Sequence, residues 1–365
     1  MQPFDPLAQL RESKDPQFDV FVQGVVFLDI VFTGLTELPR GGTEVWAEGM
    51  GSCPGGIANL AVAAARLGLR TSLGAAFGDD DYGEFCWRTL QEQEQVDLSM
   101  SRRYDGWHSP VTVSIAAEGD RTMVTHGHAP PEDASTMIGC PPRSRVVLLE
   151  LSPDQPIGGG QGWADRARAH GALLFADVGW DASGAWDRGV LRQLEYCHAF
   201  TPNAAEAMAY TRERTPQDAL YALADLVPLA VVTNGPQGAL AYDSTTGEEA
   251  NVPALRVQAT DPTGAGDVFA AALTLGTLAR WPLVDRLAFA ALCSSLAVQQ
   301  VGGSLAAPGW GDIADWWHRT LACPDVGAYH EAVRRRYAFL ADIIPEVPGG
   351  AVRRAAATIA RLSDA

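Results

Sequence analysis

The sequence almost lacks lysine: Lys14 is the one lysine in 365 residues. A phosphate loop of the Walker type needs a Gly-Lys-Ser or Gly-Lys-Thr step, so this chain cannot contain one. Its formal net charge of −17 also argues against a nucleic-acid surface, which requires clustered Lys and Arg. We therefore expect any phosphate group bound here to be held by backbone amides, arginine and metal ions.

The sequence also lacks a cysteine framework and a membrane segment. Its six cysteines are scattered without a Cys-x-x-Cys pair, which fits reduced thiols better than a disulfide frame or a zinc site. Residues 1–18 are polar and do not resemble a signal peptide. No apolar run reaches membrane-spanning length, and a hydrophobic fraction of 47% is enough for a large core. We expect a cytoplasmic globular protein without a nucleic-acid or membrane partner.

A glycine-rich turn, Asp-Pro-Thr-Gly-Ala-Gly-Asp at residues 261–267, precedes a run of strong helix formers. Gly264 and Gly266 permit a tight turn that exposes backbone N–H groups at a helix N-terminus, where an anion binds readily. Asp267 would lie in the same cradle, where a carboxylate could take a proton from an attacking hydroxyl. The simpler alternative is that Asp267 only caps the helix.

A second glycine motif opens an alanine-rich helix that ends near Gly68. Gly55 and Gly56 allow a ligand to approach the backbone, and Asn59 offers a donor and an acceptor to a hydroxyl. Tight packing of a helix on a sheet would explain the same residues. Asp29 ends a long apolar stretch, residues 19–29, which we expect to form one buried strand whose final acid faces a ligand crevice. A turn or cap role for Asp29 is the alternative.

Three short apolar runs, residues 145–150, 172–177 and 229–233, are separated by helical stretches. This pattern predicts a parallel sheet with crossover helices, an α/β fold. Residues 108–126 alternate around a Glu-Gly-Asp turn and predict a hairpin, and residues 30–46 indicate another hairpin or flap.

Asn203 and Glu206 are spaced so that they share one face of a helical turn. An amide and a carboxylate placed in this way can hold the waters of a Mg²⁺ ion, which prefers oxygen ligands. The same spacing is also a common capping pattern at a helix N-terminus. The sequence leaves both interpretations open.

The two glycine motifs, in this order, resemble the motifs of the ribokinase-like (PfkB) carbohydrate kinases. The resemblance covers residues 18–308. It implies a doubly wound, mostly parallel sheet flanked by helices, with a small β-sheet lid built from about residues 30–50 and 108–126. The chain departs from the family after Asp177, where an Asn-x-Arg element is usual and Val178-Gly179-Trp180-Asp181 stands instead.

The resemblance implies ATP-dependent phosphorylation of a hydroxyl group on a sugar or sugar-like molecule, with Mg²⁺. Asp267 would be the general base, and the amides of Gly264, Ala265 and Gly266 would form the anion hole. The other implied roles fall into three groups: substrate binding by Asp29, Gly55, Gly56 and Asn59; nucleotide binding by Thr233, Gly235, Gly238 and Asn203; and cation binding by Glu206 (Mg²⁺ through water) and by Asp261 and Thr263 (a monovalent cation such as K⁺).

Two other functions stay open. A nucleoside kinase shares the fold and the motifs, and aromatic lid residues that stack on a base would distinguish it. A catalytically silent sugar-binding regulator is a different class, and the intact Asp267 and glycines argue against it. The sequence does not name the sugar.

The resemblance also divides the chain. We expect an N-terminal arm at residues 1–17, the kinase domain at 18–308 and a helical extension at 309–365. The extension is rich in aromatic residues, with two helical segments and a third at 352–362. So much apolar surface must pack on something. It would cover either the outside of the core or a second subunit, and the latter would make a homodimer.

Overall fold

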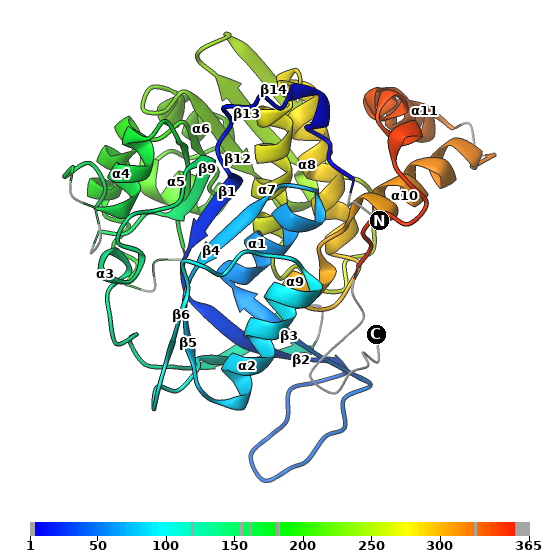
Figure 1. Cartoon of the computed structure of the whole chain (residues 1–365). Helices are drawn as coiled ribbons and strands as arrows, with labels where there is room; N and C mark the ends of the chain where they lie inside the picture. The colour runs from blue at the N-terminus through cyan, green and yellow to red at the C-terminus, as the bar shows by residue number, and fades with distance from the viewer. Residues whose placement is uncertain are drawn as a thin grey trace.

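The structure is a computed structural model that describes residues 4–117, 120–153, 156–160, 162–179, 181, 183–324 and 327–354. A central eight-stranded sheet lies between helices, and a separate four-stranded sheet extends from one side (Figure 1). No helix in these described ranges is both long enough and apolar enough to span a membrane.

The central sheet is parallel over six strands and antiparallel at one end, where β13 and β14 form a hairpin beside β12. The three apolar runs form β9, β10 and β12, so the predicted parallel sheet is confirmed. In spatial order the strands are β14 (Glu248–Val252), β13 (Ala239–Asp243), β12 (Leu229–Thr233), β11 (Ala199–Phe200), β10 (Leu173–Asp177), β9 (Ser144–Glu150), β1 (Phe18–Gln23) and β4 (Thr71–Gly74).

Helices cover both faces of this sheet, because alternate residues of each central strand point to opposite sides. In β1, Val20 and Val22 belong to one buried cluster and Phe21 to another. The first cluster includes α1 (Ile57–Arg66), α7 (Ala265–Leu278) and α8 (Leu283–Ala297). The second includes α3 (Ala134–Ile138), α4 (Trp163–Ala169), the 3₁₀-helix η3 (Arg188–Tyr196), α5 (Ala204–Thr211) and α6 (Pro216–Ala224). This two-sided core is the predicted doubly wound architecture.

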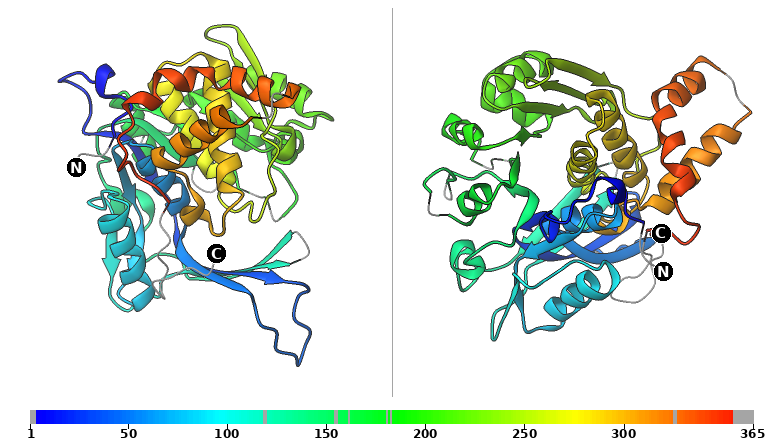
Figure 2. Two further views of the ribbon diagram at one scale, coloured as in Figure 1. Left: turned by 90° about the vertical axis from the view of Figure 1, so that its right-hand side faces the viewer. Right: turned by 45° about the horizontal axis from the view of Figure 1, so that its top comes forward.

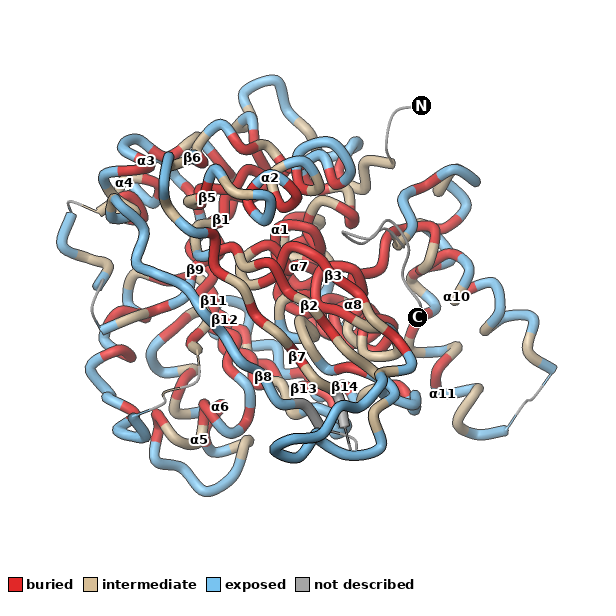
Figure 3. The backbone as a smooth tube through the Cα atoms, turned by 90° about the horizontal axis from the view of Figure 1, so that it is seen from below, coloured by how far each residue is buried: buried red, intermediate tan, exposed pale blue. Residues whose placement is uncertain are grey.

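The four-stranded lid has the order β3 (Gly49–Gly56), β2 (Val26–Leu35), β7 (Val111–Ala117) and β8 (Asp120–His126). The predicted hairpin at 108–126 is confirmed as β7 and β8. The loop between β2 and β3 extends away from the body (Figure 2), and its Trp46 side chain is 88% exposed. Within the lid, β3 is largely buried, whereas the loop between β2 and β3 is exposed (Figure 3).

The prediction of one strand over residues 19–29 was wrong. The chain leaves the central sheet after Gln23 and enters the lid at Val26, so the lid begins earlier than residue 30. At Gly24 a side chain would come within 2.8 Å of the Ile57 Cβ atom, so the chain bends tightly around the start of α1. Asp29 therefore lies in the middle of a lid strand and does not end a core strand.

A smaller unit follows β4 along the chain and contacts lid strand β2 through its helix. It contains β5 (Ala76–Gly78), α2 (Asp81–Arg88), the π-helix η2 (Thr89–Gln93) and β6 (Arg102–Tyr104). The Asp80 carboxylate accepts a hydrogen bond from the Gly83 amide and so caps α2. The acids at residues 79–81 thus mark a helix start, and the described residues contain no group of three or more His, Cys, Asp or Glu able to hold a metal ion directly.

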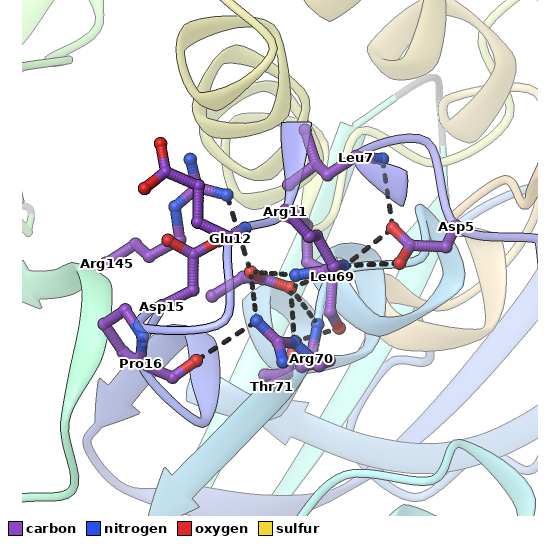
Figure 4. A network of polar contacts seen from close by, with 11 residues as sticks. Asp5, Leu7, Arg11, Glu12, Asp15, Pro16, Leu69, Arg70, Thr71 and Arg145 are labelled. Carbon is purple, nitrogen blue, oxygen red and sulfur yellow. Dashed lines mark hydrogen bonds and ion pairs between the residues drawn. The ribbon is translucent and has the colours of Figure 1, made fainter. Parts of the chain in front are cut away.

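The N-terminal segment, with η1 (Ala8–Leu10), is fixed to the beginning of β1 (Figure 4). Arg11 donates hydrogen bonds to Asp5 and to the fully buried Asp19, and the Arg70 amide donates to Asp19 at 2.9 Å. Burial alone would raise the pKa of Asp19, but the hydrogen bonds from Arg11 and Arg70 hold it below its usual value. This network fastens the segment at the amino ends of the parallel strands.

The chain beyond the central domain packs against α8 and α1 (Figure 1). The Trp310 ring stacks on Phe289 with centroids 5.5 Å apart, and its indole N–H donates to the Leu67 carbonyl at 2.8 Å. Residues 352–354 are not helical, and the rest of the expected third helix lies outside the described residues. The elements here are α9 (Gly303–Ala306), α10 (Trp310–Ala322), α11 (Ala328–Arg336), η5 (Ala338–Asp342) and η6 (Ile344–Glu346).

Candidate active site

A cavity of about 650 Å³ opens at the carboxyl ends of β1, β9 and β10, beneath the beginning of the lid. In an open α/β sheet this edge is where ligands bind. Of the residues expected to act on a substrate, Gly56, Asn59 and Asp267 line this cavity. Glu150 and Asp177 line it as well.

A second, smaller and mostly apolar pocket of about 290 Å³ lies next to α7. Its walls include Leu255, Val257, Phe269 and Val298, together with Thr233, Gly235 and Gly238 from the turn after β12. Ala265 and Gly266 also line it. The N-terminus of α7 therefore separates the two pockets, with Asp267 on one side and Gly266 on the other.

The turn before α7 depends on Gly264. Its φ angle of +73° lies in the left-handed region, and an added Cβ atom would come within 3.0 Å of the Gly303 Cα atom. Gly266 is different, because a Cβ atom there would meet no described atom within 4 Å. The protein itself requires a glycine at 264, whereas at 266 the absent side chain leaves space in the second pocket.

Asp267 is half-buried in the first turn of α7, whose N-cap is Gly264. The side-chain amide of Asn59 donates a hydrogen bond of 3.3 Å to the Asp267 carboxylate. Desolvation by the surrounding protein raises the pKa of Asp267 to about 6, the Asn59 hydrogen bond opposes this rise, and the charge of Glu150 adds to it. A carboxylate with this pKa can accept a proton near neutral pH.

Asn59 has one side-chain atom without a partner. Its Oδ1 is buried and accepts no hydrogen bond from the described residues. Buried acceptors are nearly always satisfied, so this oxygen suits a donor supplied by a ligand, such as a hydroxyl. Asn59 thus joins the general-base candidate to the substrate side of the cavity.

Asp29 and Gly55 lie together beside the cavity and are not among the described residues that line it. The Asp29 carboxylate occupies the space above Gly55, where an added Cβ atom would come within 1.8 Å of an Asp29 oxygen. Gly56 has a φ of +61°, and a Cβ atom there would be 2.4 Å from the Val25 carbonyl. The glycine pair is thus required by backbone geometry and by the close approach of Asp29.

Carboxylates gather at the cavity, and Glu150 among them was missed from the sequence. Glu150 reaches solvent, yet desolvation raises its pKa. Burial and repulsion by Glu206 raise the pKa of Asp177 well above its usual value. Burial also raises the pKa of Glu206, against hydrogen bonds from Asn203. The sequence feature that could have identified Glu150 is its position at the end of an apolar strand, which Asp177 shares.

Asn203 and Glu206 form the capping box of α5. The Asn203 side chain accepts from the Glu206 amide, and the Glu206 carboxylate accepts from the Asn203 amide, each at 3.0 Å. Neither residue is among the described residues that line the two pockets. The structure thus contains the capping box, and the charge of Glu206 also acts on Asp177 in the cavity.

Asp261 and Thr263 organise the loop that precedes α7. One Asp261 oxygen accepts from the Thr263 amide at 2.9 Å and from its hydroxyl at 2.5 Å. The other accepts from the Gly302 amide at 3.0 Å. The Val298 carbonyl accepts from the Thr260 and Asp261 amides. The carboxylate thus fixes this loop to the segment that follows α8.

The chain is similar in sequence to known kinases. Ribokinase of Schizosaccharomyces pombe is 29% identical over 289 residues, which cover 74% of this chain and 89% of that protein. Aminoimidazole riboside kinase of Salmonella typhimurium is 30% identical over 276 residues, which cover 70% of this chain and 85% of that protein.

The structure of a putative ribokinase II from E. coli, in complex with ATP and Mg²⁺, has the same fold, with a TM-score of 0.68 and 19% identity over 83% of this chain and 99% of that chain. A family profile described as pfkB family carbohydrate kinase matches residues 25–309. The chain therefore belongs to the pfkB family of carbohydrate kinases, which are ATP-dependent.

Proposed function

We propose that this kinase transfers the γ-phosphoryl group of ATP to a hydroxyl of an uncharged sugar or sugar-like alcohol. The main support for this proposal is that an apolar pocket and an acid-lined cavity lie on the two sides of the N-terminus of α7. ATP would place its base in the apolar pocket and its phosphates at the exposed amides of α7. The acceptor would occupy the larger cavity, with its hydroxyl near Asp267.

Asp267 is the general base in this proposal. As the acceptor oxygen bonds to the γ-phosphorus, its proton passes to the Asp267 carboxylate and the bond from the γ-phosphorus to the bridging oxygen of ADP breaks. The amides of Gly264, Ala265 and Gly266 stabilise the charge that develops on the phosphoryl oxygens, with the Ala265 amide giving up its 3.2 Å hydrogen bond to the Pro262 carbonyl. Asn59 orients the Asp267 carboxylate through its hydrogen bond. Asp29 binds acceptor hydroxyls from the lid.

The carboxylates of the cavity fit a Mg²⁺ requirement. Desolvation raises the pKa values of Glu150, Asp177 and the neighbouring Glu206, and repulsion between the acids adds to the rise at Asp177 and Glu206, so a divalent cation would relieve that repulsion. They would hold Mg²⁺ mainly through its waters, as Mg²⁺ commonly binds in phosphate sites. When bound, the ion would neutralise the phosphate charge.

The charge of the larger cavity supports an uncharged acceptor. Three acids line it, and none of the described lining residues is Lys, Arg or His. A phosphorylated sugar would bring negative charge to this surface without a basic partner. We therefore assign the substrate to the neutral polyhydroxy compounds.

A nucleoside acceptor is the second candidate. Phe27, from lid strand β2, lines the larger cavity and offers an aromatic face beneath the lid. Bases stack on such faces, and one of the relatives is named as a riboside kinase. A nucleoside would therefore bind with its base stacked on Phe27.

The test is a phosphorylation assay with ATP and Mg²⁺ on matched acceptors: ribose, fructose, their phosphates and a set of nucleosides. We expect transfer to at least one unphosphorylated acceptor and none to the sugar phosphates, with Asp267→Asn as the inactive control. Preference for a sugar phosphate would contradict the assignment. A nucleoside preference that Phe27→Ala abolishes would support the second candidate.

A further inference from the structure

One short segment, residues 302–307, contacts Asp261, Gly264, Asn59 and lid strand β3. The Gly302 amide donates to Asp261 at 3.0 Å. Gly303 lies against Asn59 and Gly264, since an added Cβ atom at 303 would come within 2.4 Å of the Asn59 Oδ1 atom. The Ser304 hydroxyl donates to the Pro54 carbonyl in lid strand β3 at 2.5 Å. The position of this segment therefore fixes the anion hole, the partner of Asp267 and the base of the lid.

Two arginines hold this segment from the other side. Arg66, at the end of α1, donates to the carbonyls of Leu305 and Ala307 at 3.0 and 2.7 Å. Its guanidinium also forms a buried, bidentate pair with Glu94, with two contacts of 2.8 Å. Arg354 donates to the carbonyl between these two, that of Ala306, at 3.0 Å.

Arg354 lies beyond residue 309, where the match to the family ends. Its guanidinium also donates to the Leu296 carbonyl in the last turn of α8 at 3.1 Å. It thereby joins α8 to α9, the two elements on either side of the loop that carries Val298 and Gly302. That loop is where the Asp261 turn is attached.

The route that brings Arg354 to this place is built into the start of α10. The Gly311 amide donates to the Val352 carbonyl at 2.9 Å. At Gly309 an added Cβ atom would come within 2.3 Å of the same carbonyl oxygen, so the returning chain needs a glycine there. The Asp312 carboxylate accepts from the Arg354 amide at 3.0 Å and lies 3.5 Å from its guanidinium.

We infer that Arg354 is a positioning residue for phosphoryl transfer, through which the C-terminal extension sets the geometry of the anion hole. This inference rests on the proposed function of Asp267 and the α7 turn. Arg354 contacts neither pocket, so its action is indirect: it fixes the carbonyls of Leu296 and Ala306, which in turn fix Gly302 and Gly303. The extension is then part of the catalytic apparatus as well as a cover for the core.

Arg354 can be tested where Arg66 cannot. The Arg66 side chain is 2% exposed and its loss would leave Glu94 as an unpaired buried charge, which would destabilise the whole fold. The Arg354 side chain is 20% exposed, so its replacement by Gln is better tolerated. Arg353 supplies the matched control, because it has the same charge one position away and pairs with the exposed Asp315.

The experiment compares Arg354→Gln, Arg354→Lys and Arg353→Gln in the full chain, well below their melting temperatures. We expect Arg354→Gln to lower kcat by about tenfold or more, as small misplacements of a site do. Arg354→Lys, which keeps one donor and the charge, should recover part of this loss, and Arg353→Gln should stay within about twofold of the parent. Amide hydrogen exchange at residues 298–307 should rise in Arg354→Gln alone.

Two results would overturn the inference. In the first, the parent is active and Arg354→Gln is folded and equally active. In the second, Arg354→Gln loses kcat only in proportion to its loss of folded protein, as measured by circular dichroism. Failure of the proposed function looks different, because the parent itself would transfer no phosphoryl group to any acceptor. In that case Arg354 has no positioning role in catalysis either. If amide hydrogen exchange at residues 298–307 is also unchanged in Arg354→Gln, Arg354 does not hold the segment in place.

Discussion

The side-chain amide of Asn59 donates a hydrogen bond to the carboxylate of Asp267 across 208 positions of the chain. Asn59 comes from the helix that follows the lid, and Asp267 from the helix that begins at the glycine turn. The contact joins the substrate side of the site to its proposed base. Any change in how the lid strand enters α1 should therefore reach Asp267 directly.

Replacement of Asp267 by Asn should abolish most of the turnover while leaving the fold intact. The amide has the same shape but cannot accept the hydroxyl proton, so we expect kcat to fall by about 10²–10⁴-fold. Steady-state kinetics measure the loss, and calorimetry should show unchanged ATP binding. Asp285→Asn, which alters another half-buried acid in the first turn of a helix, is the control. Near-parental turnover in Asp267→Asn would remove Asp267 from the mechanism.

The pH dependence of kcat/KM should report the ionisation of Asp267. Its pKa of about 6 lies above the usual value of 3.8, and the base works only when ionised, so activity should rise as pH increases through about 6. Glu150→Gln removes a repelling charge and should move this midpoint down. Asn59→Ala removes the hydrogen bond that stabilises the carboxylate and should move it up. Profiles taken below both KM values test this, and shifts in the same direction would contradict the assignment.

The two glycines of the turn should respond in opposite ways to alanine. Gly264→Ala places a side chain at positive φ, which costs roughly 1–2 kcal/mol, and also presses on Gly303. Gly266→Ala meets no described atom and should stabilise the fold by about 0.4–1 kcal/mol, yet its methyl group enters the apolar pocket that we propose for the nucleotide. Urea unfolding and the KM for ATP separate the effects. A Gly266→Ala variant with an unchanged KM for ATP would place the nucleotide elsewhere.

Asp29→Ala should weaken binding of the acceptor and leave ATP alone. Loss of a hydrogen bond to a charged group is worth about 1.5–3 kcal/mol, which corresponds to roughly a 10–100-fold rise in KM. The control is Glu44→Gln, which removes an exposed carboxylate from the same lid. The KM values for both substrates give the answer, and equal effects on the two would show that Asp29 does not bind the acceptor.

A monovalent cation should activate the enzyme through the Asp261 loop. We expect lower kcat when K⁺ is replaced at constant ionic strength by a large organic cation, because the loop attached to Asp261 shapes the anion hole. Asp261→Asn should reduce this dependence. Activity that is identical in both salts would mean that the hydrogen bonds from Thr263 and Gly302 alone organise the loop.

Local pattern was enough for much of the architecture. The apolar runs of β9, β10 and β12 predicted a parallel sheet because strands buried on both faces carry continuous apolar residues. Local pattern failed at residues 19–29, because strand propensity continues through Gly24 although the chain passes there from the central sheet to the lid. At this bend Gly24 lies close against Ile57, which is distant in sequence. Asn203 and Glu206 show the same limit, since one spacing serves a helix cap and a metal site alike.

By itself, then, the sequence determined many of the local elements and reactive residues, such as the tight turn at residues 264–266, the helix that follows it, and Asp177 at the end of a strand. These depend on neighbours along the chain, where backbone sterics and periodicity act. The tertiary structure alone decided which of them meet. It paired Asn59 with Asp267, added Glu150 to the cavity, set Asp29 over Gly55 and returned Arg354 to α9. Such contacts arise from packing between distant segments, and no local rule of propensity or spacing encodes them.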